Sequence, residues 1–399
     1  MEKELKNIPE LRFPEFIKLG DWEKKKIESI ISQESSTMAM NKLELLKEGF
    51  PVYGADGLIG YINDFQQKEE YISMVKDGSG VGKLNLCQKH SSILGTLTAL
   101  KSKDSKRYFL KWIYYLLNTL DFSSYVKGAG IPHIYYSDIK HKCIYIPSFS
   151  EQEKIADCLS SLDDYINATQ EKIEILQAHK KGLIQQLLPA LGKTMPQKRL
   201  PKFGKSKKWS PYSMEEMFKI RNGYTPSKSN PKFWEDGTIP WFRMEDIREH
   251  GHILSDSIQH ITKEAVKGKG LFPANSIIVA TTATIGEHAL IIVDSLANQR
   301  FTFLTKRKSF DTQIDMKYFY YYMYIIDEWC KQHTNAGGFA SVDMNGFKRL
   351  SVSLPSPEEQ KEIAECFASI DDLIDSTKQK LVMLQKHKQG LMQQLFPRL

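Results

Sequence analysis

Cysteine is scarce in this chain of 399 residues: there are five, and none stands in the Cys-x-x-Cys spacing of a zinc or redox motif. There is also no run of about 18 uncharged apolar residues, so no membrane-spanning helix is expected. The segment Met1–Lys6 is charged and lacks the apolar core of a secretory signal. These absences exclude a disulfide scaffold and indicate a cytoplasmic protein.

Catalytic and cofactor motifs are missing as well. The segment Gly78–Lys83 (GSGVGK) lacks the first glycine and the Ser or Thr of a phosphate-binding P-loop, and it also fails the dinucleotide-binding glycine pattern. Asn230–Phe233 (NPKF) lacks the second proline of the tetrapeptide of adenine methyltransferases. No His, Cys or carboxylate spacing fits a metal site. We therefore expect this chain to bind no cofactor or metal, and to leave catalysis to other chains.

What the chain does have is an internal repeat. Residues 147–191 and 355–399 are identical at 24 of 45 positions without a gap, at a constant offset of 208. A weaker repeat precedes each block, because Arg12 and Trp22 recur as Arg199 and Trp209 at an offset of 187. Between these blocks the offset drifts: Val81-Gly82 aligns with Ile285-Gly286, and Gly130 with Gly338. The second copy thus carries 21 extra residues, about 17 of them before Gly286.

Each repeated block is predicted to be a long helix. Both open with Pro-Ser followed by Glu-Gln, which suits a helix N-terminus. Apolar residues and threonines then alternate at spacings of four and three, the seam of a short coiled coil, and each seam skips one position, at Lys180 and Lys388. The seam positions are Ile155, Leu159, Leu162, Ile166, Thr169, Ile173, Leu176, Leu183 and Leu187, and then Ile363, Phe367, Ile370, Ile374, Thr377, Leu381, Leu384, Leu391 and Leu395. We expect the two helices to pair; packing of each on its own domain is the alternative.

The interiors between these blocks are predicted to be mixed α/β domains. Short β-rich runs such as Ser276–Ala280 alternate with turns that contain Gly and Asn. The aromatic stretches 108–120 and 318–329 are predicted to be buried helices, with base stacking as the alternative. The predicted segments are an N-terminal segment 1–21, a first domain 22–146, a first helical block 147–191, a basic linker 192–208, a second domain 209–354 and a second helical block 355–399. The fold class is α+β, with two mixed α/β domains separated by two long helices that pair as an antiparallel coiled coil, in a pseudo-two-fold repeat.

The charge balance permits binding to nucleic acid without requiring it. The formal net charge is +7, and a basic surface binds nucleic acid through counterion release. Cations gather in the linker 192–208, which has no acidic residue; they are Lys193, Lys198, Arg199, Lys202, Lys205, Lys207 and Lys208. This stretch is either a solvated linker or a strip that contacts phosphates.

Several of these segments resemble one known family. The opening Pro-x-Leu-Arg-Phe-Pro-x-Phe-x5-Trp (9–22) and both Pro-x-x-x-Glu-Gln-x-x-Ile-Ala blocks (147–156 and 355–364) resemble type I restriction enzyme specificity subunits. Gly223–Ser227, Ile239–Trp241 and Asn298-Gln299 look like segments of that family's target-recognition domains. The likeness covers essentially the whole chain. The first domain, however, has no clear counterpart of the Gly-x-Thr-Pro-Ser segment and offers Val52–Gly60 in its place.

The resemblance implies a function. Each domain would read one half of a split, asymmetric site in double-stranded DNA, and the paired helices would hold the two halves at a fixed spacing. Two methyltransferase subunits would dock on the helices and methylate adenine N6. Two motor-nuclease subunits would complete the restriction complex. S-adenosylmethionine, ATP and Mg would be bound by these partners, and this chain would have no active site of its own.

Helix length agrees with a role in spacing. About 36 helical residues span roughly 54 Å, enough to place two domains about one DNA turn, roughly 34–36 Å, apart on one face. If each domain covers about 3–5 base pairs, the unread spacer is about 5–8.

Candidate DNA contacts are polar side chains in loops that contain glycine, because Asn or Gln pairs with adenine and Arg with guanine. In the second domain these residues are Tyr224, Thr225, Ser227, Arg243, Thr284, Asn298, Gln299 and Arg300. In the first domain they are Tyr53, Lys76, Ser79, Lys83, His133, Tyr135 and Tyr136. For each one, a structural or phosphate-contacting role is the alternative.

Two other functions stay open on sequence alone. One is a catalytic DNA methyltransferase or nuclease, against which the missing cofactor glycines argue. The other is a coiled-coil scaffold, or a phage-type decoy of the same architecture. Binding of S-adenosylmethionine to the isolated chain would favour the first, and absence of sequence-specific DNA binding by the assembled complex would favour the second.

Overall fold

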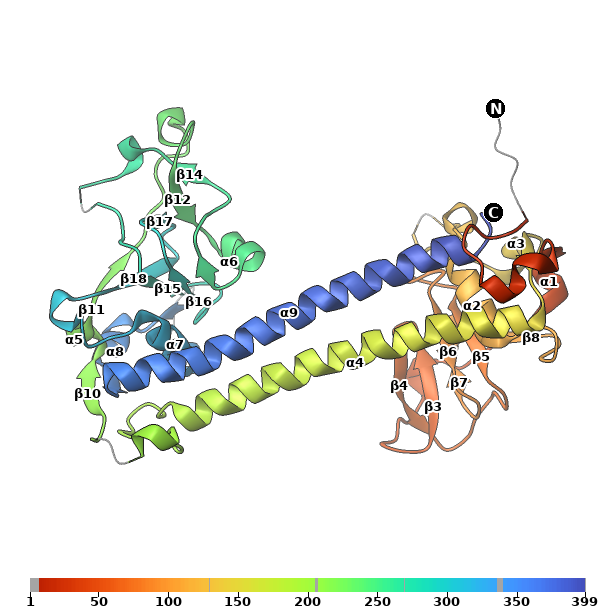
Figure 1. The fold of residues 1–399 in the computed structure, drawn as a ribbon, viewed down its shortest axis with the longest axis horizontal. Coiled ribbons are helices and arrows are strands. Elements are labelled where there is room, and N and C mark those ends of the chain that lie inside the picture. The colour runs from red at the N-terminus through yellow and green to blue at the C-terminus, as the bar shows by residue number, and fades with distance from the viewer. Residues whose placement is uncertain (1–6, 129, 205–206, 269, 336–339, 399) are drawn as a thin grey trace. The chain divides into compact units, whose positions relative to one another are not determined.

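The computed structural model describes residues 7–128, 130–204, 207–268, 270–335 and 340–398 (Figure 1). The chain forms two compact units. The first is built from two segments that are distant in sequence, and the second from one continuous segment. Unit 1 comprises residues 1–171 and 378–399, and unit 2 comprises residues 172–377. Each unit therefore contains one of the two domains, the beginning of the helix that follows it and the end of the other long helix.

The described part of the domain in unit 1 contains three small sheets and the helices packed on them, and the smallest sheet is the antiparallel pair β1-β9. A four-stranded antiparallel sheet has the order β2-β8-β5-β6, and a three-stranded sheet has the order β4-β3-β7, in which β7 is parallel to β3. The strands are β1 (Glu23–Lys26), β2 (Ile31–Ser35), β3 (Phe50–Gly54), β4 (Gly57–Ile62), β5 (Tyr71–Val75), β6 (Leu84–Cys87), β7 (Ser92–Ile93), β8 (Leu97–Ser102) and β9 (Cys143–Ile146). The helices before the long one are α1 (Ile27–Ile30), α2 (Leu110–Asn118) and α3 (Tyr136–Ile139).

The domain in unit 2 repeats this plan with additions. Its larger sheet has the order β11-β18-β15-β16-β13, and β12 lies between β14 and β17, parallel to β17. The strands are β10 (Ser210–Ser213), β11 (Phe218–Asn222), β12 (Ile239–Phe242), β13 (Ile253–Leu254), β14 (His260–Ile261), β15 (Ser276–Ala280), β16 (His288–Ile291), β17 (Leu296–Ala297), β18 (Phe301–Lys306), β19 (Thr334–Asn335), β20 (Ser341–Val342) and β21 (Ser351–Leu354). The helices are α5 (Met214–Met217), α6 (Met244–His250), α7 (Met316–Gln332) and α8 (Met344–Arg349).

The aromatic stretches form buried helices, as the sequence predicts. In unit 1, Trp112 of α2 is fully buried, and its ring centroid lies 6.2 Å from that of Trp22. In unit 2, Tyr318 and Tyr322 of α7 are fully buried. Burial of these rings provides much of the apolar contact that holds each helix on its sheet. These three side chains are therefore unavailable for base stacking.

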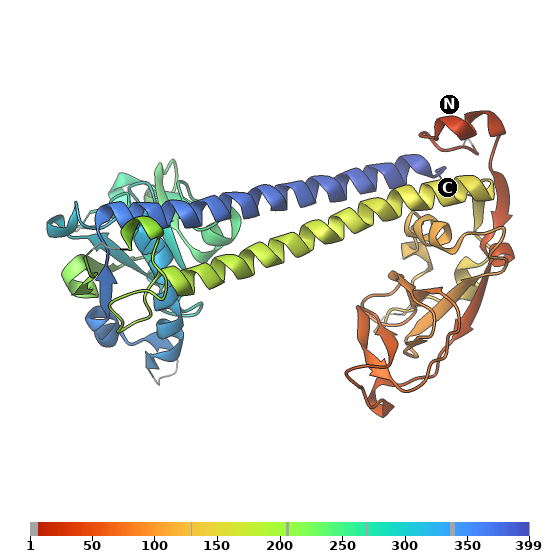
Figure 2. The same ribbon diagram turned by 60° about the horizontal axis from the view of Figure 1, so that its bottom comes forward.

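The repeated blocks form two helices of 39 residues each, α4 (Phe149–Leu187) and α9 (Pro357–Leu395). Every predicted seam residue of both helices is buried or half-buried. The skipped seam positions make ion pairs between the helices: Lys388 with Asp163 at 2.5 Å in unit 1, and Lys180 with Asp371 at 2.6 Å in unit 2. Asp163 lies early in α4 and pairs with Lys388 late in α9, whereas Lys180 lies late in α4 and pairs with Asp371 early in α9. Helices α4 and α9 therefore run antiparallel within each unit (Figure 2). Coiled-coil packing of the seam stays a prediction.

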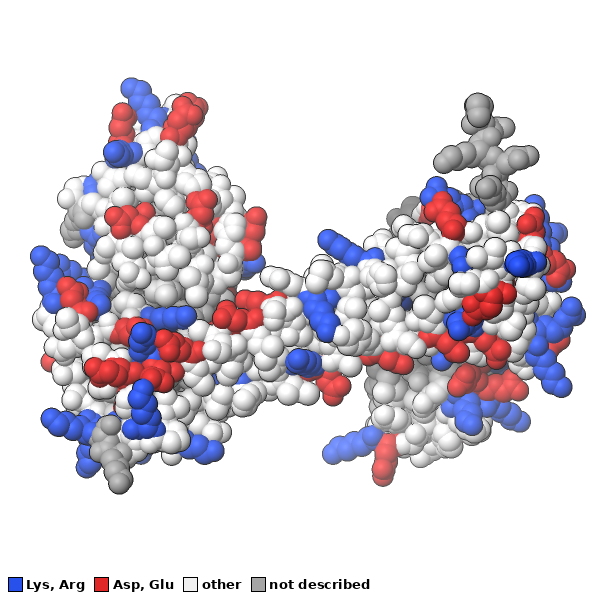
Figure 3. All heavy atoms as spheres, viewed as in Figure 1, with Lys and Arg blue, Asp and Glu red and all other residues white. Residues whose placement is uncertain are grey.

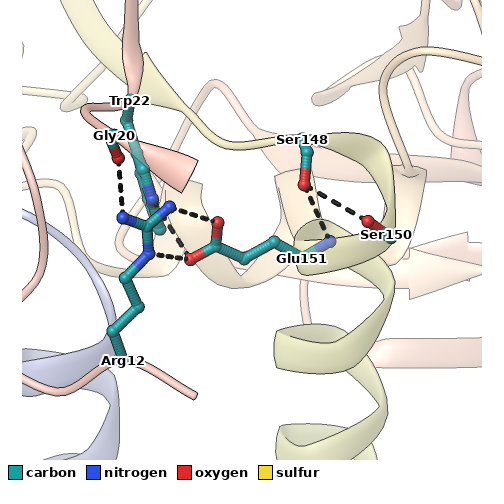
Figure 4. A network of polar contacts seen from close by, with 6 residues as sticks. All are labelled: Arg12, Gly20, Trp22, Ser148, Ser150 and Glu151. Carbon is teal, nitrogen blue, oxygen red and sulfur yellow. Dashed lines mark hydrogen bonds and ion pairs between the residues drawn. The ribbon is translucent and has the colours of Figure 1, made fainter. Parts of the chain in front are cut away.

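A buried polar contact attaches the segment that precedes each domain to the start of the long helix that follows the domain. Ser148 and Ser356 cap the two helices by accepting hydrogen bonds from the backbone N–H groups of Glu151 and Glu359. In unit 1, the guanidinium of Arg12 donates two hydrogen bonds of 2.8 Å to the carboxylate of Glu151, as Figure 4 shows. In unit 2, Arg199 and Glu359 make the same two-bonded pair. The Glu side chains raise the pKa of both arginines by accepting these hydrogen bonds.

The glutamine that follows each of these glutamates makes the same backbone hydrogen bonds in both units. Gln152 accepts a hydrogen bond from the backbone of Phe109 at 2.9 Å and donates to the carbonyl of Pro147. Gln360 makes the equivalent contacts with the backbone of Asp315 and the carbonyl of Pro355. Both glutamines are buried, so these bonds satisfy backbone groups that water does not reach. The Pro-x-x-x-Glu-Gln motif is therefore the joint between domain and helix.

Two cations of the basic linker form ion pairs with carboxylates of α9. Arg199 is held by Glu359, and Lys202 pairs with Glu362 at 2.5 Å. Lys205 lies outside the described residues, and so does Gly338. On the face shown in Figure 3, cations and carboxylates are interspersed on both units rather than gathered by sign. Arg199 is therefore unavailable for a phosphate contact, and contact of the other linker cations with phosphates stays a prediction. No helix among the described residues is long and apolar enough to cross a membrane.

Candidate nucleic-acid interface

The most informative surface feature of unit 2 is a cavity of about 430 Å³ where four loops meet. The loops follow β11, β12, β15 and β17, so the cavity lies at one edge of the second domain's sheets. Its walls are Thr225, Lys228, Trp241, Arg243, Met244, Glu245, Arg248, Thr282, Ala283, Thr284, Asn298, Gln299 and Arg300. Six of the eight side chains predicted for this domain line it; Tyr224 and Ser227 do not.

The Gly-Tyr-Thr segment after β11 supports the loop 298–300. A β-carbon at Gly223 would lie 2.2 Å from the carbonyl oxygen of Ala297, so only glycine allows the two backbones to approach so closely. The hydroxyl of Tyr224 donates to the carbonyl of Ala265 at 3.2 Å and accepts from the backbone N–H of Lys267 at 2.7 Å. Tyr224 is thus a scaffold residue and lies outside the cavity wall.

The two amides in the cavity are also engaged with the protein. The hydroxyl of Thr225 donates to the side-chain oxygen of Gln299 at 2.6 Å. The side-chain oxygen of Asn298 accepts from the backbone N–H of Arg300 at 3.0 Å. These bonds fix the shape of the loop, so Thr225 and Asn298 position the cavity wall.

The cavity has a positive balance of charge. Lys228, Arg243, Arg248 and Arg300 line it, against one carboxylate, Glu245. Glu245 lies 3.9 Å from the Nε of Arg243, and that Nε has no hydrogen-bond partner among the described residues. The side chains of Lys228, Arg248 and Arg300 form no ion pair or hydrogen bond with any part of the chain that is described. Cations without a counter-charge in a concave site favour an anionic or acceptor-rich ligand.

The turn after β15 is strained. Ala283 has a φ of +62°, in the left-handed region where residues other than glycine are uncommon. The turn forms part of the cavity wall, and non-glycine residues in this conformation concentrate at functional sites. In unit 1 the matching position is Gly78, with a φ of +101°.

Backbone hydrogen bonds show that the first domain has the same plan. In unit 1, the N–H of Lys76 donates to the carbonyl of Thr96, and in unit 2 the N–H of Thr281 donates to that of Arg300, both near 2.9–3.0 Å. Gly82 donates to Val75 as Gly286 donates to Ala280, so the predicted alignment of Gly82 with Gly286 is confirmed. The loop after β5 and the loop after β15 are therefore built in the same way, although their side chains differ.

The candidate residues of the first domain come from two adjoining segments and β3. The loop 76–83 carries Lys76, Ser79 and Lys83, and it contacts the segment 126–135 through the N–H of Gly78, which donates to the carbonyl of Pro132. Lys83 is exposed and pairs with Asp56 of the β3–β4 turn at 3.0 Å. That contact brings the loop close to the hairpin that contains Tyr53.

The three candidate tyrosines of the first domain differ in exposure. Tyr135 is 48% exposed, and its ring centroid lies 5.1 Å from that of His133. Tyr136 donates to the carbonyl of Ile31 at 2.7 Å, and burial raises the pKa of its hydroxyl to about 12. Tyr53 is half-buried in β3, and burial raises its pKa as well. The geometry thus leaves Tyr135 and His133 free to reach a ligand and assigns Tyr136 to the scaffold.

Sequence reasoning missed two cations of the cavity in unit 2. Lys228 follows Ser227, which instead contacts Ser229, and Arg248 lies on α6. Nothing in the local pattern marks these residues, because their position depends on loops that meet from distant parts of the chain.

Comparison with known proteins shows that most of the chain matches one protein family. The model of a family described as "Type I restriction modification DNA specificity domain" matches residues 20–177 and 206–386. The chain is 49% identical over 167 residues to the type I restriction enzyme EcoprrI specificity subunit of Escherichia coli, covering 42% of this chain and 41% of that protein. It is 30% identical over 291 residues to the EcoR124I/EcoR124II specificity subunit of the same organism, covering 69% and 66%. The chain thus spans less than two thirds of the length of either relative.

A solved structure extends the likeness to the fold of the entire chain. The S subunit of a type I restriction-modification system from M. genitalium superposes with a TM-score of 0.61 at 18% identity, covering 98% of this chain and all of that one.

Proposed function

The chain belongs to the family of type I restriction modification DNA specificity domains, and on this premise we propose that it reads two separate stretches of double-stranded DNA, one with each domain. The observation that carries the proposal is the match between the two domains: the backbone plan is shared and the side chains at matching places are not. Lys76 corresponds to Thr281, and Thr96 to Arg300. Different side chains at one backbone position select different base edges. The target is therefore a bipartite, asymmetric site.

The chain's contribution is recognition. The cavity in unit 2 supplies arginines and a lysine for phosphates and guanine edges, and hydroxyl groups for either. Its partners supply the chemistry: methyltransferase subunits methylate adenine N6 and motor-nuclease subunits cleave. We assign S-adenosylmethionine, ATP and Mg to those subunits. Among the described residues, no cluster of His, Cys, Asp and Glu could hold a metal ion.

The long helices carry a surface for two copies of one partner. In unit 1, Tyr165 and Met383 are exposed by 46% and 64%, and in unit 2, Leu373 and Ile175 are exposed by 43% and 60%. The repeat relates Tyr165 to Leu373 and Ile175 to Met383 at the offset of 208. Each unit therefore presents one pair of exposed apolar side chains from the same two positions of the helices. A surface that occurs twice binds the same partner twice, so we assign one methyltransferase subunit to each pair.

Stoichiometry tests this docking surface. Native mass spectrometry of the complex should give two methyltransferase subunits per copy of this chain. Replacing Tyr165 and Met383 by serine should remove one of them, and replacing Ile175 and Leu373 should remove the other. Asn167→Ser, an exposed change on the same helix, is the control. A fully active complex with one methyltransferase subunit contradicts the assignment.

Exchange of one domain tests the reading of DNA. Replacing residues 209–354 by the corresponding domain of a relative should change one half of the methylated sequence and leave the other half intact. The outcome follows because the second domain's sheets and cavity lie within unit 2. Simultaneous change of both halves would show that the domains do not read independently.

A further inference from the structure

Helix α6 distinguishes the second domain from the first. In unit 1, β3 turns directly into β4 through Ala55 and Asp56. In unit 2, β12 is followed by α6 and β13 before β14 completes the matching sheet. Part of the insertion of about 17 residues before Gly286 therefore builds α6 and β13, and the described residues between β3 and β4 of the first domain form neither. Helix α6 forms one wall of the cavity.

Two side chains of α6 face the cavity with their charges available. Glu245 and Arg248 are three positions apart, so they lie on the same face of the helix. Arg248 is exposed and has no side-chain partner among the described residues. Glu245 is 58% exposed, and its nearest cation, Arg243, is at 3.9 Å, too far for a hydrogen bond.

The helix that presents them is firmly held. Asp246, which is fully buried, accepts hydrogen bonds of 2.6 Å from the backbone N–H groups of Arg243 and Ile258. Ile247 is buried in the apolar cluster around Trp241. The positions of Glu245 and Arg248 are thus fixed from the buried side of α6, which is what recognition of a base edge requires.

The carboxylate is informative because a site for phosphates alone would be weakened by it. A negative charge repels the DNA backbone unless it contacts a donor. In the major groove, the amino group of cytosine is such a donor, and guanine offers two acceptors, O6 and N7, that suit an arginine. A neighbouring carboxylate and arginine therefore complement the two bases of one G·C pair.

We propose that α6 reads a G·C base pair in the second half-site, with Arg248 donating to O6 and N7 of guanine and Glu245 accepting from N4 of the paired cytosine. The proposal rests on the proposed function and makes it specific: it names the base pair and the residues that select it. Lys228, Arg243 and Arg300 then take the neighbouring phosphates and base acceptors. In the described part of the first domain, no helix stands between β3 and β4, so this domain reads its half-site without this device.

Mapping of methylated adenines in cells that express the complex with single variants tests the assignment. Glu245→Ala and Arg248→Ala should each relax one and the same position of the second half-site, with a roughly 10- to 100-fold loss of preference for G·C there. The first half-site should be unchanged. Glu249→Gln on α6 and Lys263→Ala, exposed residues outside the cavity, are the matched controls and should keep the wild-type motif.

The outcomes separate this proposal from the proposed function. If both variants weaken methylation equally at all sites and Arg248→Ala lowers the salt dependence of DNA binding, the residues contact phosphates and the G·C assignment is wrong. An unchanged motif in both variants also overturns it. A wild-type complex that methylates no defined bipartite motif would instead refute the proposed function.

Discussion

Replacing Glu151 by alanine should loosen unit 1 and leave unit 2 intact. The Glu151 side chain is 1% exposed and the Arg12 side chain 10% exposed, and the carboxylate also accepts a hydrogen bond from the indole N–H of Trp22 at 3.3 Å (Figure 4). Glu151→Ala leaves a buried guanidinium without its counter-charge. Removal of one partner of such a pair costs about 3–5 kcal/mol. The local opening equilibrium should therefore rise roughly a hundredfold to several thousandfold.

Hydrogen exchange followed by mass spectrometry measures this loss for each unit separately. Amide protection should fall in the peptides that contain β1, β9 and the first turns of α4, while those of β10, β21 and α9's first turns serve as an internal control. Glu153→Ala, an exposed change on the same helix, should have no effect. The double variant Arg12→Met with Glu151→Leu should recover much of the protection, since an apolar pair tolerates burial. Unchanged protection in Glu151→Ala, or an equal loss in both units, would refute the reasoning.

Three further predictions follow from the geometry. Gly223→Ala should abolish methylation that depends on the second domain, because a β-carbon there meets the carbonyl of Ala297 at 2.2 Å; a wild-type methylation pattern would contradict this. Ala283→Gly should raise the free energy of unfolding by up to about 1 kcal/mol, since relief of the left-handed alanine outweighs the entropy of glycine, and a lower melting temperature would refute it. Seven residues inserted in both α4 and α9 keep the heptad phase and add about 10 Å, so the unread spacer should grow by roughly 3 base pairs, whereas an insertion of two residues should abolish assembly. Sequencing of the methylated sites measures the spacer, and an unchanged spacer at full activity would contradict the role of helix length in spacing.

The regular parts of the fold could be predicted from the sequence because their signals are local or repeated. The seam spacing predicted both long helices, which begin only a few residues earlier than the Glu-Gln pair, at Phe149 and Pro357. The strand 276–280 has the predicted bounds. The gaps in the seam at Lys180 and Lys388 were visible but unexplained, since an ion pair to another helix leaves no trace in local spacing.

The cavity could be predicted only in part. Asn298 and Gln299 were found by residue type, but their bonds to Arg300 and Thr225 show that part of their work is to shape a loop. Arg248 escaped notice because its place depends on the packing of α6 against distant strands. Residue type predicts what a side chain can bind, whereas its partners in the fold decide whether it is free to do so.

Genome-wide mapping of methylated adenines, with and without the gene for this chain, tests the central claim most directly. The account predicts one asymmetric motif made of two fixed stretches separated by unread bases, present in the wild type and lost on deletion. A single continuous motif, or a methylation pattern that survives deletion unchanged, would contradict it.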